Sequence, residues 1–122
     1  MRFLLMHRLD ESLPEAWNPS PEFIEKMGAF MQESVANGTL ITGEGVHKSE
    51  KGAMVRKERG GPASATDGPF TEAKEVIGGF ALINAKDRAQ AVAFAQRYAD
   101  LFPEVSVEVR QVVEFDELPT PA

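Results

Sequence analysis

Charged and turn-forming residues crowd together in the segment ATDGPFTEAKEVIGGFAL, residues 65–82. Asp67 precedes a Gly-Pro-Phe turn, and Glu72, Lys74 and Glu75 follow that turn closely. A carboxylate at the mouth of a pocket can act as a general acid or base, and a lysine beside it can hold an anionic substrate. Asp67 is therefore a candidate catalytic residue, and Glu72, Lys74 and Glu75 are candidate ligand-binding residues.

The same turn also has a purely structural interpretation. Asp67 can accept backbone hydrogen bonds, Gly68 can supply an unusual backbone conformation, Pro69 stiffens the loop and Phe70 fills the core. A short helical turn over residues 71–75 would follow. This interpretation leaves the charges after the turn as solvated side chains, so both interpretations stay open.

A second set of charges lies in the last predicted strand, where valines alternate with polar residues. Strand alternation sends the valines to one face of a sheet and Glu108 and Arg110 to the other. If the valines pack beneath helices, the charged side chains face the interior of an assembled barrel. There the planar guanidinium would suit a carboxylate or an enolate oxygen. The alternative is a structural ion pair of Arg110 with Glu108 or with Asp67.

His7 stands at the end of the first predicted strand, where it could line a cleft. It is the second candidate catalytic residue, although a lone histidine is more often structural. The spacing of His7 and His47 matches no metal-binding motif, and neither the Gly-Glu-Gly at 43–45 nor the Gly-Gly at 78–79 opens a helix as a phosphate loop does. We therefore expect neither a metal nor another cofactor.

The elements that must position these residues follow from periodicity and capping signals. Ser20 and Pro21 begin a helix that ends at Asn37-Gly38, and Asp87 caps a second helix with Gln90 in an imperfect capping box. The predicted strands cover residues 3–6, 39–47, 76–84 and 105–115, and a polar hairpin turning at Gly60-Gly61 covers 53–68. The apolar stripe of the first helix is expected at Ile24, Met27, Met31 and Val35, flanked by Phe23 and Phe30.

This order of elements favours an α+β fold of the ferredoxin-like type, βαββαβ with a hairpin insertion and a mainly antiparallel sheet. Two helices cannot cover both faces of such a sheet, so both lie on one face. The other face is left bare and, because it carries apolar residues, needs a partner. A second copy of the chain is the simplest partner. We therefore expect a homodimer whose sheets enclose an interior.

Composition excludes several classes of protein. The chain has 122 residues, which suits a single domain, expected over 1–118 with a loose tail at 119–122. Its net charge of −6 and the lack of a basic run argue against nucleic acid or an anionic membrane as partner. It has no cysteine, which excludes disulfides and thiolate chemistry. The apolar run at 3–6 is too short for a signal sequence or a membrane span, so a cytoplasmic location is expected.

The stretch TDGPFTEAKEVIGGF at 66–80 resembles the signature of the YCII-related family, and specifically its DGPF subgroup. The segments ANGTLITGEGV at 36–46 and VEVRQV at 107–112 agree with that pattern. The resemblance implies a ferredoxin-like fold assembled as a dimeric α+β barrel. Barrels of that class include lactone isomerases, dehalogenating enzymes and cofactor-independent monooxygenases, and some DGPF proteins are linked to sigma-factor regulation.

The chain departs from the narrower YciI-type pattern at two positions. Those proteins carry a His early in the first helix and an Asp just before the Gly that ends it, where this chain has Phe23 and Ala36. A mechanism based on that His–Asp pair therefore cannot be carried over.

Three classes of function remain. The first is a lyase or isomerase acting on an anionic metabolite in the dimer interior, with Asp67 or His7 transferring protons and Arg110 or Lys74 stabilising charge. The second is a non-catalytic ligand-binding or sensing module, and the third is a regulatory protein-interaction partner. A protein that only binds other proteins has no need of charged side chains inside a barrel, so the sequence favours the first two classes of function.

Overall fold

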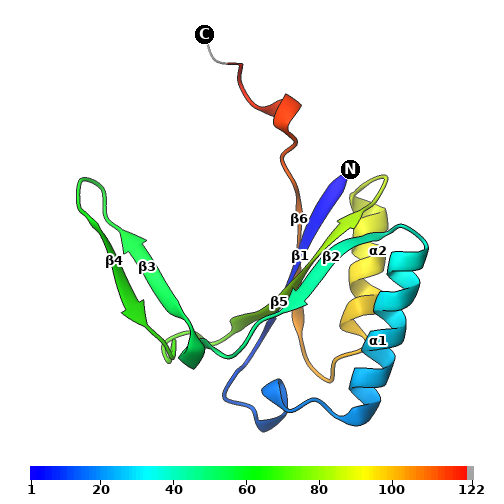
Figure 1. Ribbon diagram of the computed structural model, residues 1–122, viewed down its shortest axis with the longest axis horizontal. Coiled ribbons are helices and arrows are strands. Elements are labelled where there is room, and N and C mark those ends of the chain that lie inside the picture. Colours follow the sequence, from blue (N-terminus) through cyan, green and yellow to red (C-terminus); the bar gives the residue numbers. More distant parts are fainter. Residues whose placement is uncertain (121–122) are drawn as a thin grey trace.

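A four-stranded antiparallel sheet with two helices on one face forms the body of the protein in the computed structural model, which describes residues 1–120 (Figure 1). The strand order is β2-β5-β1-β6, and a separate two-stranded sheet pairs β3 with β4. The elements are β1 (Arg2–Leu9), α1 (Pro21–Ala36), β2 (Leu40–Gly45), β3 (Ala53–Lys57), β4 (Ala63–Asp67), β5 (Val76–Asn84), α2 (Arg88–Ala99) and β6 (Ser106–Gln111). The predicted ferredoxin-like α+β fold is confirmed.

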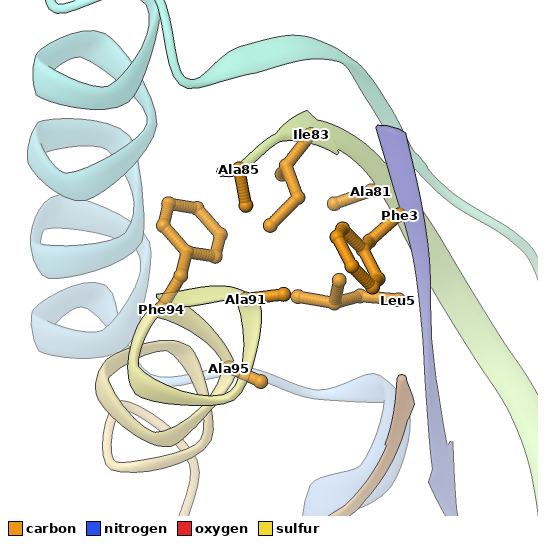
Figure 2. Close-up of a cluster of buried hydrophobic side chains, with 8 residues drawn as sticks. All are labelled: Phe3, Leu5, Ala81, Ile83, Ala85, Ala91, Phe94 and Ala95. Atoms are coloured by element: carbon orange, nitrogen blue, oxygen red, sulfur yellow. The ribbon is translucent and has the colours of Figure 1, made fainter. Parts of the chain in front are cut away.

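Strand β1 runs through the centre of the sheet and sorts its side chains by face. Phe3, Leu5 and His7 are buried and point toward the helices, while the alternate residues face the open side of the sheet. Figure 2 shows the resulting core, in which Phe3 and Leu5 of β1 meet residues of β5 and α2. The core cluster consists of Phe3, Leu5, Ala81, Ile83, Ala85, Ala91, Phe94 and Ala95.

Both helices begin at the predicted caps. The Ser20 hydroxyl accepts a hydrogen bond from the Phe23 amide at 3.1 Å, and Asp87 accepts one from the Gln90 amide at 2.8 Å. The Gln90 side chain accepts a hydrogen bond from the amide of Lys86 and not from the amide of the cap residue, Asp87. The predicted capping box is therefore displaced by one residue. After α1 the chain turns at Gly38, whose φ of +80° lies in the left-handed region that glycine tolerates.

The inward face of α1 differs from the predicted stripe. Met27 and Met31 are half-buried as expected, but Ile24 and Val35 are exposed. The aromatic residues set the rotation of the helix, because Phe30 packs against Phe94 of α2 with ring centroids 5.1 Å apart. This rotation moves Ile24 and Val35 to the flank of the helix.

Two segments extend away from the body (Figure 1). The β3–β4 hairpin is exposed along both strands and turns at Gly60, as predicted. The last strand was predicted to reach residue 115 but ends at Gln111, and the chain then leaves the sheet. A bidentate ion pair between Arg2 and Glu114, at 2.9 and 3.0 Å, fixes this segment where it departs. Of the predicted tail at 119–122, the last two residues lie outside the described part of the chain.

No helix within residues 1–120 has both the length and the apolar character required to cross a lipid bilayer.

Candidate functional site

His7 lies where the hydrophobic core gives way to a cavity. It is only 9% exposed, and it pairs with Gly79 of β5, next to a bulge that leaves Gly78 as the extra residue. A Cβ at Gly78 would lie 2.6 Å from Nε2 of His7, and one at Gly79 would lie 2.7 Å from Cε1. The glycine pair is therefore required because the imidazole ring rests directly on the backbone of β5.

Tyr98 of α2 holds the other side of the ring. Its hydroxyl hydrogen-bonds to Nδ1 of His7 at 2.6 Å, and Tyr98 itself is 4% exposed. Burial lowers the pKa of the His7 imidazole and raises the pKa of the Tyr98 hydroxyl. At neutral pH both groups are therefore uncharged.

The second ring nitrogen of His7 opens on the cavity. Nε2 has no hydrogen-bond partner among residues 1–120. Every fully enclosed side-chain nitrogen or oxygen in that part of the chain does have a partner, so Nε2 is not fully enclosed. Nε2 is therefore accessible to a molecule in the cavity. It is the polar group that the buried end of the site offers to a ligand.

The cavity has a volume of about 870 Å³ and lies between α1, the loop that follows β1, and the end of the sheet. We call it the His7 cavity. Its apolar walls include Trp17, Phe23, Met27, Met31 and Phe102. Trp17, from a short 3-10 helix over Pro14–Trp17, donates from its indole nitrogen to the Val46 carbonyl at 3.1 Å and so ties this loop to the end of β2. A cavity of this size and character suits a small organic molecule.

Acidic residues dominate the charged lining of the His7 cavity. The lining formed by residues 1–120 contains several acidic residues, whereas its full positive charge comes from Lys74 alone. Hydrogen bonds from Ser12, and more weakly the charge of Lys74, lower the pKa of Asp10. The acidic lining residues are Asp10, Glu15, Glu75 and Glu104. Glu44 also borders the cavity, but it pairs with Phe80 and so its side chain faces the open side of the sheet. The cavity thus has a negative lining at neutral pH.

The structure brings together only part of the predicted site. His7, Lys74 and Glu75 all line the His7 cavity. Asp67 and Glu72 line a different hollow at the base of the β3–β4 hairpin, which Glu75 also borders. The two candidate catalytic residues, Asp67 and His7, therefore do not share a site within the chain.

Glu108 and Arg110 lie on the open face of the sheet, away from the helices. Val107 and Val109 pack against the core, as the alternation predicted. Arg110 Nη1 lies 3.0 Å from Glu108 Oε2, and Arg8 reaches the same carboxylate at 3.2 Å. The hydrogen bond from Arg110 is the main cause of the lowered pKa of Glu108. Of the two predicted ion pairs the one with Glu108 forms, whereas residues 1–120 contain none between Arg110 and Asp67.

The Asp-Gly-Pro-Phe turn is a tightly bonded corner. The Gly68 amide donates to the Gly52 carbonyl at 2.9 Å, and the Phe70 amide donates to the Ser49 hydroxyl at 2.8 Å. Ser49 is buried, and its hydroxyl also hydrogen-bonds to the Glu11 carboxylate. Gly68 is required because a Cβ there would overlap the Ser49 carbonyl, and not because of a positive φ.

The region after this corner is irregular. The helical turn expected at 71–75 does not form, and a single turn closed by the Ala73 amide and the Phe70 carbonyl takes its place. Phe70 is half-buried, so it only partly fills a core.

Sequence reasoning missed the contact of Tyr98 with His7. One signal was available, because a buried tyrosine hydroxyl needs a hydrogen-bond partner. Phe23 lines the His7 cavity, whereas Ala36 is exposed at the end of α1. Within residues 1–120 no cluster of three or more His, Cys, Asp or Glu side chains could hold a metal ion.

Comparison with known proteins identifies the family of the chain. The sequence profile of the YCII-related domain matches residues 1–116, which is nearly the whole chain. No curated protein matches the sequence.

Proposed function

Since the chain belongs to the YCII-related domain family, we propose that its His7 cavity binds a small carbonyl compound and that the protein acts on it as a cofactor-independent isomerase or lyase. The observation that carries this proposal is the hydrogen bond between Tyr98 and Nδ1 of His7 at 2.6 Å. It holds the imidazole ring with Nε2 toward the cavity. The ligand site thus has one oriented polar group surrounded by apolar walls.

The protonation of the pair decides what His7 offers to a ligand. The Tyr98 hydroxyl keeps its proton, because burial raises its pKa, and Nδ1 is its hydrogen-bond partner among residues 1–120. If the hydroxyl donates to Nδ1, a neutral imidazole carries its own proton on Nε2. Nε2–H then points into the cavity as a donor. Such a donor stabilises the negative charge that develops on a carbonyl oxygen when an enolate forms.

Proton transfer at carbon also requires a base, and the lining carboxylates supply candidates. Glu75 is the one that sequence reasoning also selected, and it directly precedes β5. In the proposed step a carboxylate removes a proton from the carbon next to the carbonyl while Nε2–H stabilises the enolate oxygen. Return of the proton to the same or a neighbouring carbon completes an isomerisation.

The lining also favours an uncharged ligand for this cavity. The acidic side chains that outnumber Lys74 would repel a carboxylate or phosphate. The expectation of an anionic metabolite depended on Arg110, which lies on the opposite face of the sheet. That expectation stays a prediction for a pocket between two open faces in a dimer.

Assembly and subgroup belong to the same proposal. The Asp-Gly-Pro-Phe turn and the glycine pair at 78–79 support membership of the DGPF subgroup. The open face of the sheet supports a homodimer, because its half-buried apolar side chains have nothing packed over them in one chain; they include Leu4, Met6, Phe80 and Leu82. A specific interface should bury at least ~1,000 Å² in total.

A non-catalytic sensing module, of the kind that could take part in sigma-factor regulation, is the second candidate. One observation favours it: the charged lining residues Glu15, Glu75 and Glu104 are all exposed. The buried end of the cavity therefore holds a donor but no buried carboxylate. Such a cavity can bind a carbonyl oxygen without catalysing proton transfer.

Solvent-deuterium exchange separates the two candidates. The protein is incubated in D₂O with uncharged aromatic ketones and lactones, and NMR follows both binding and deuterium incorporation next to the carbonyl. We expect binding and exchange in the wild type, and loss of both in His7→Asn. Glu33→Gln, at an exposed position of α1 that does not line the cavity, is the control and should change neither. Binding without exchange would favour the sensing module, and the absence of binding by every compound would contradict both.

A further inference from the structure

The β3–β4 hairpin and the segment that follows β6 are exposed and carry opposite charge. Three basic residues, Arg56, Lys57 and Arg59, gather at the tip of the hairpin around a single acid, Glu58. We call residues 112–118 the C-terminal arm; it carries Glu114, Asp116 and Glu117 and no basic residue. The chain as a whole has a net charge of −6, so the hairpin tip is a local basic exception. An acidic segment is therefore a complementary partner for it.

Both segments also expose apolar side chains. Phe115 of the C-terminal arm is 90% exposed, and Val113 and Leu118 beside it are exposed as well. On the hairpin, Val55 is 65% exposed. A two-stranded hairpin that packs on nothing is at best marginally stable in water. Each segment thus has apolar surface that a partner would cover, and the hairpin in particular needs one.

The two segments cannot meet within one chain as it is folded. Figure 1 shows the hairpin and the C-terminal arm extending from opposite ends of the sheet, with a wide separation between them. Both are anchored where they leave the body. The ion pair of Arg2 with Glu114 holds the arm, and the bonded corner at Gly68 and Ser49 holds the hairpin.

We propose that the C-terminal arm of one protomer lies along the β3–β4 hairpin of a second copy. The inference rests on the proposed homodimer and adds the segments that join it. Asp116 and Glu117 would meet the basic tip of the partner subunit's hairpin, and Phe115 would cover Val55 of the partner subunit, which lies on the same face of the hairpin as Lys57 of the partner subunit. Two-fold symmetry forms this contact twice, so each favourable charge pair counts double in the dimer.

Charge reversal tests the pairing and also shows whether it joins two chains. The hairpin variant is Arg56→Glu with Lys57→Glu, and the arm variant is Asp116→Lys with Glu117→Lys. Lys86→Glu with Arg88→Glu, near the start of α2, makes the same change in charge as the hairpin variant and is the control. Dimer dissociation constants are measured by analytical ultracentrifugation at low salt. We expect each variant alone to dissociate at least about tenfold more readily than the wild type and the control, with a smaller difference at 1 M salt.

Mixing the two variants is the decisive measurement. In a mixed dimer the reversed hairpin of one chain faces the reversed arm of the other at one contact, and the unchanged arm faces the unchanged hairpin at the second. Both contacts then join opposite charges, so affinity should return to near the wild-type value. If both reversals in a single chain restore affinity but the mixture does not, the pairing is internal to one chain and the proposal is wrong. If only one variant, or neither, loses dimer affinity, the pairing is wrong but the homodimer is not contradicted. A wild type that stays monomeric at all concentrations would contradict the homodimer itself.

Discussion

At the scale of single residues, the main feature of this protein is the fixed position of the His7 imidazole. The imidazole lies on two glycines of β5 and is held by a tyrosine on the opposite side, so its position is fixed before any ligand arrives. A pre-positioned donor in a partly apolar cavity costs little reorganisation during a reaction. The same close packing makes this part of the fold intolerant of added atoms.

Gly78→Ala should therefore destabilise the protein. The added methyl group would lie 2.6 Å from Nε2 of His7, and overpacking of this kind typically costs about 1–3 kcal/mol. Gly28→Ala is the control, because a Cβ there meets nothing within 4 Å and alanine is favoured in a helix by up to about 1 kcal/mol. Urea unfolding should show a loss for the first variant and a small gain for the second. Equal stability of Gly78→Ala and wild type would mean that the ring does not rest on β5.

His7 should also make stability depend on pH. Burial lowers its pKa in the folded state below the value near 6.5 of the unfolded chain, so the unfolded state binds the proton more readily. The free energy of unfolding should then fall as the pH drops below about 6.5. Urea unfolding of wild type and His7→Gln at pH 7.5 and 5.5 measures this. The wild type should lose more stability than the variant, and equal losses would show that His7 does not carry the effect.

At the scale of elements, local signals in the sequence predicted more than contacts between distant segments. The caps at Ser20 and Asp87 and the alternating valines of β6 depend on neighbouring residues, and all three were predicted correctly. The rotation of α1 depends on where Phe30 meets α2, which no local pattern encodes. The contact of His7 with Tyr98 joins residues 91 positions apart, so the candidate site could be predicted only in part.

The Asp-Gly-Pro-Phe corner joins the hairpin to β5 and is best tested as an element. Gly68→Ala should destabilise the protein, because the new Cβ would overlap the Ser49 carbonyl and break the bonds that the Ser49 hydroxyl makes. Gly61→Ala, in the hairpin turn, meets its neighbours only at ordinary contact distance and is the matched control. We expect a loss of about 1–3 kcal/mol in the first variant and little change in the second, measured by urea unfolding. Two unchanged variants would show that the corner is not tightly packed.

At the scale of the whole molecule, the sheet separates two candidate sites. The helical side holds the His7 cavity, which residues of a single chain line, while the open side holds the charged row of Arg8, Glu108 and Arg110. The side chain of Arg110 is 70% exposed in the single chain, so a second copy would change its surroundings far more than those of His7. Assembly therefore determines whether the open face becomes a pocket.

One substitution on the open face of the sheet and one on the helical side test which of these two surfaces joins two copies of the chain. Met6 lies at the centre of the open face, between Phe80 of β5 and Glu108 of β6, whereas Ile24 is exposed on the flank of α1. Met6→Glu would place an unpaired carboxylate inside an interface formed by the open faces, and a buried unpaired charge is strongly unfavourable. Ile24→Glu makes the same chemical change on the helical side. Light scattering at micromolar concentration should find the wild type and Ile24→Glu dimeric and Met6→Glu monomeric. A dimeric Met6→Glu together with a monomeric Ile24→Glu would move the interface to the helices and contradict the assignment of the open face.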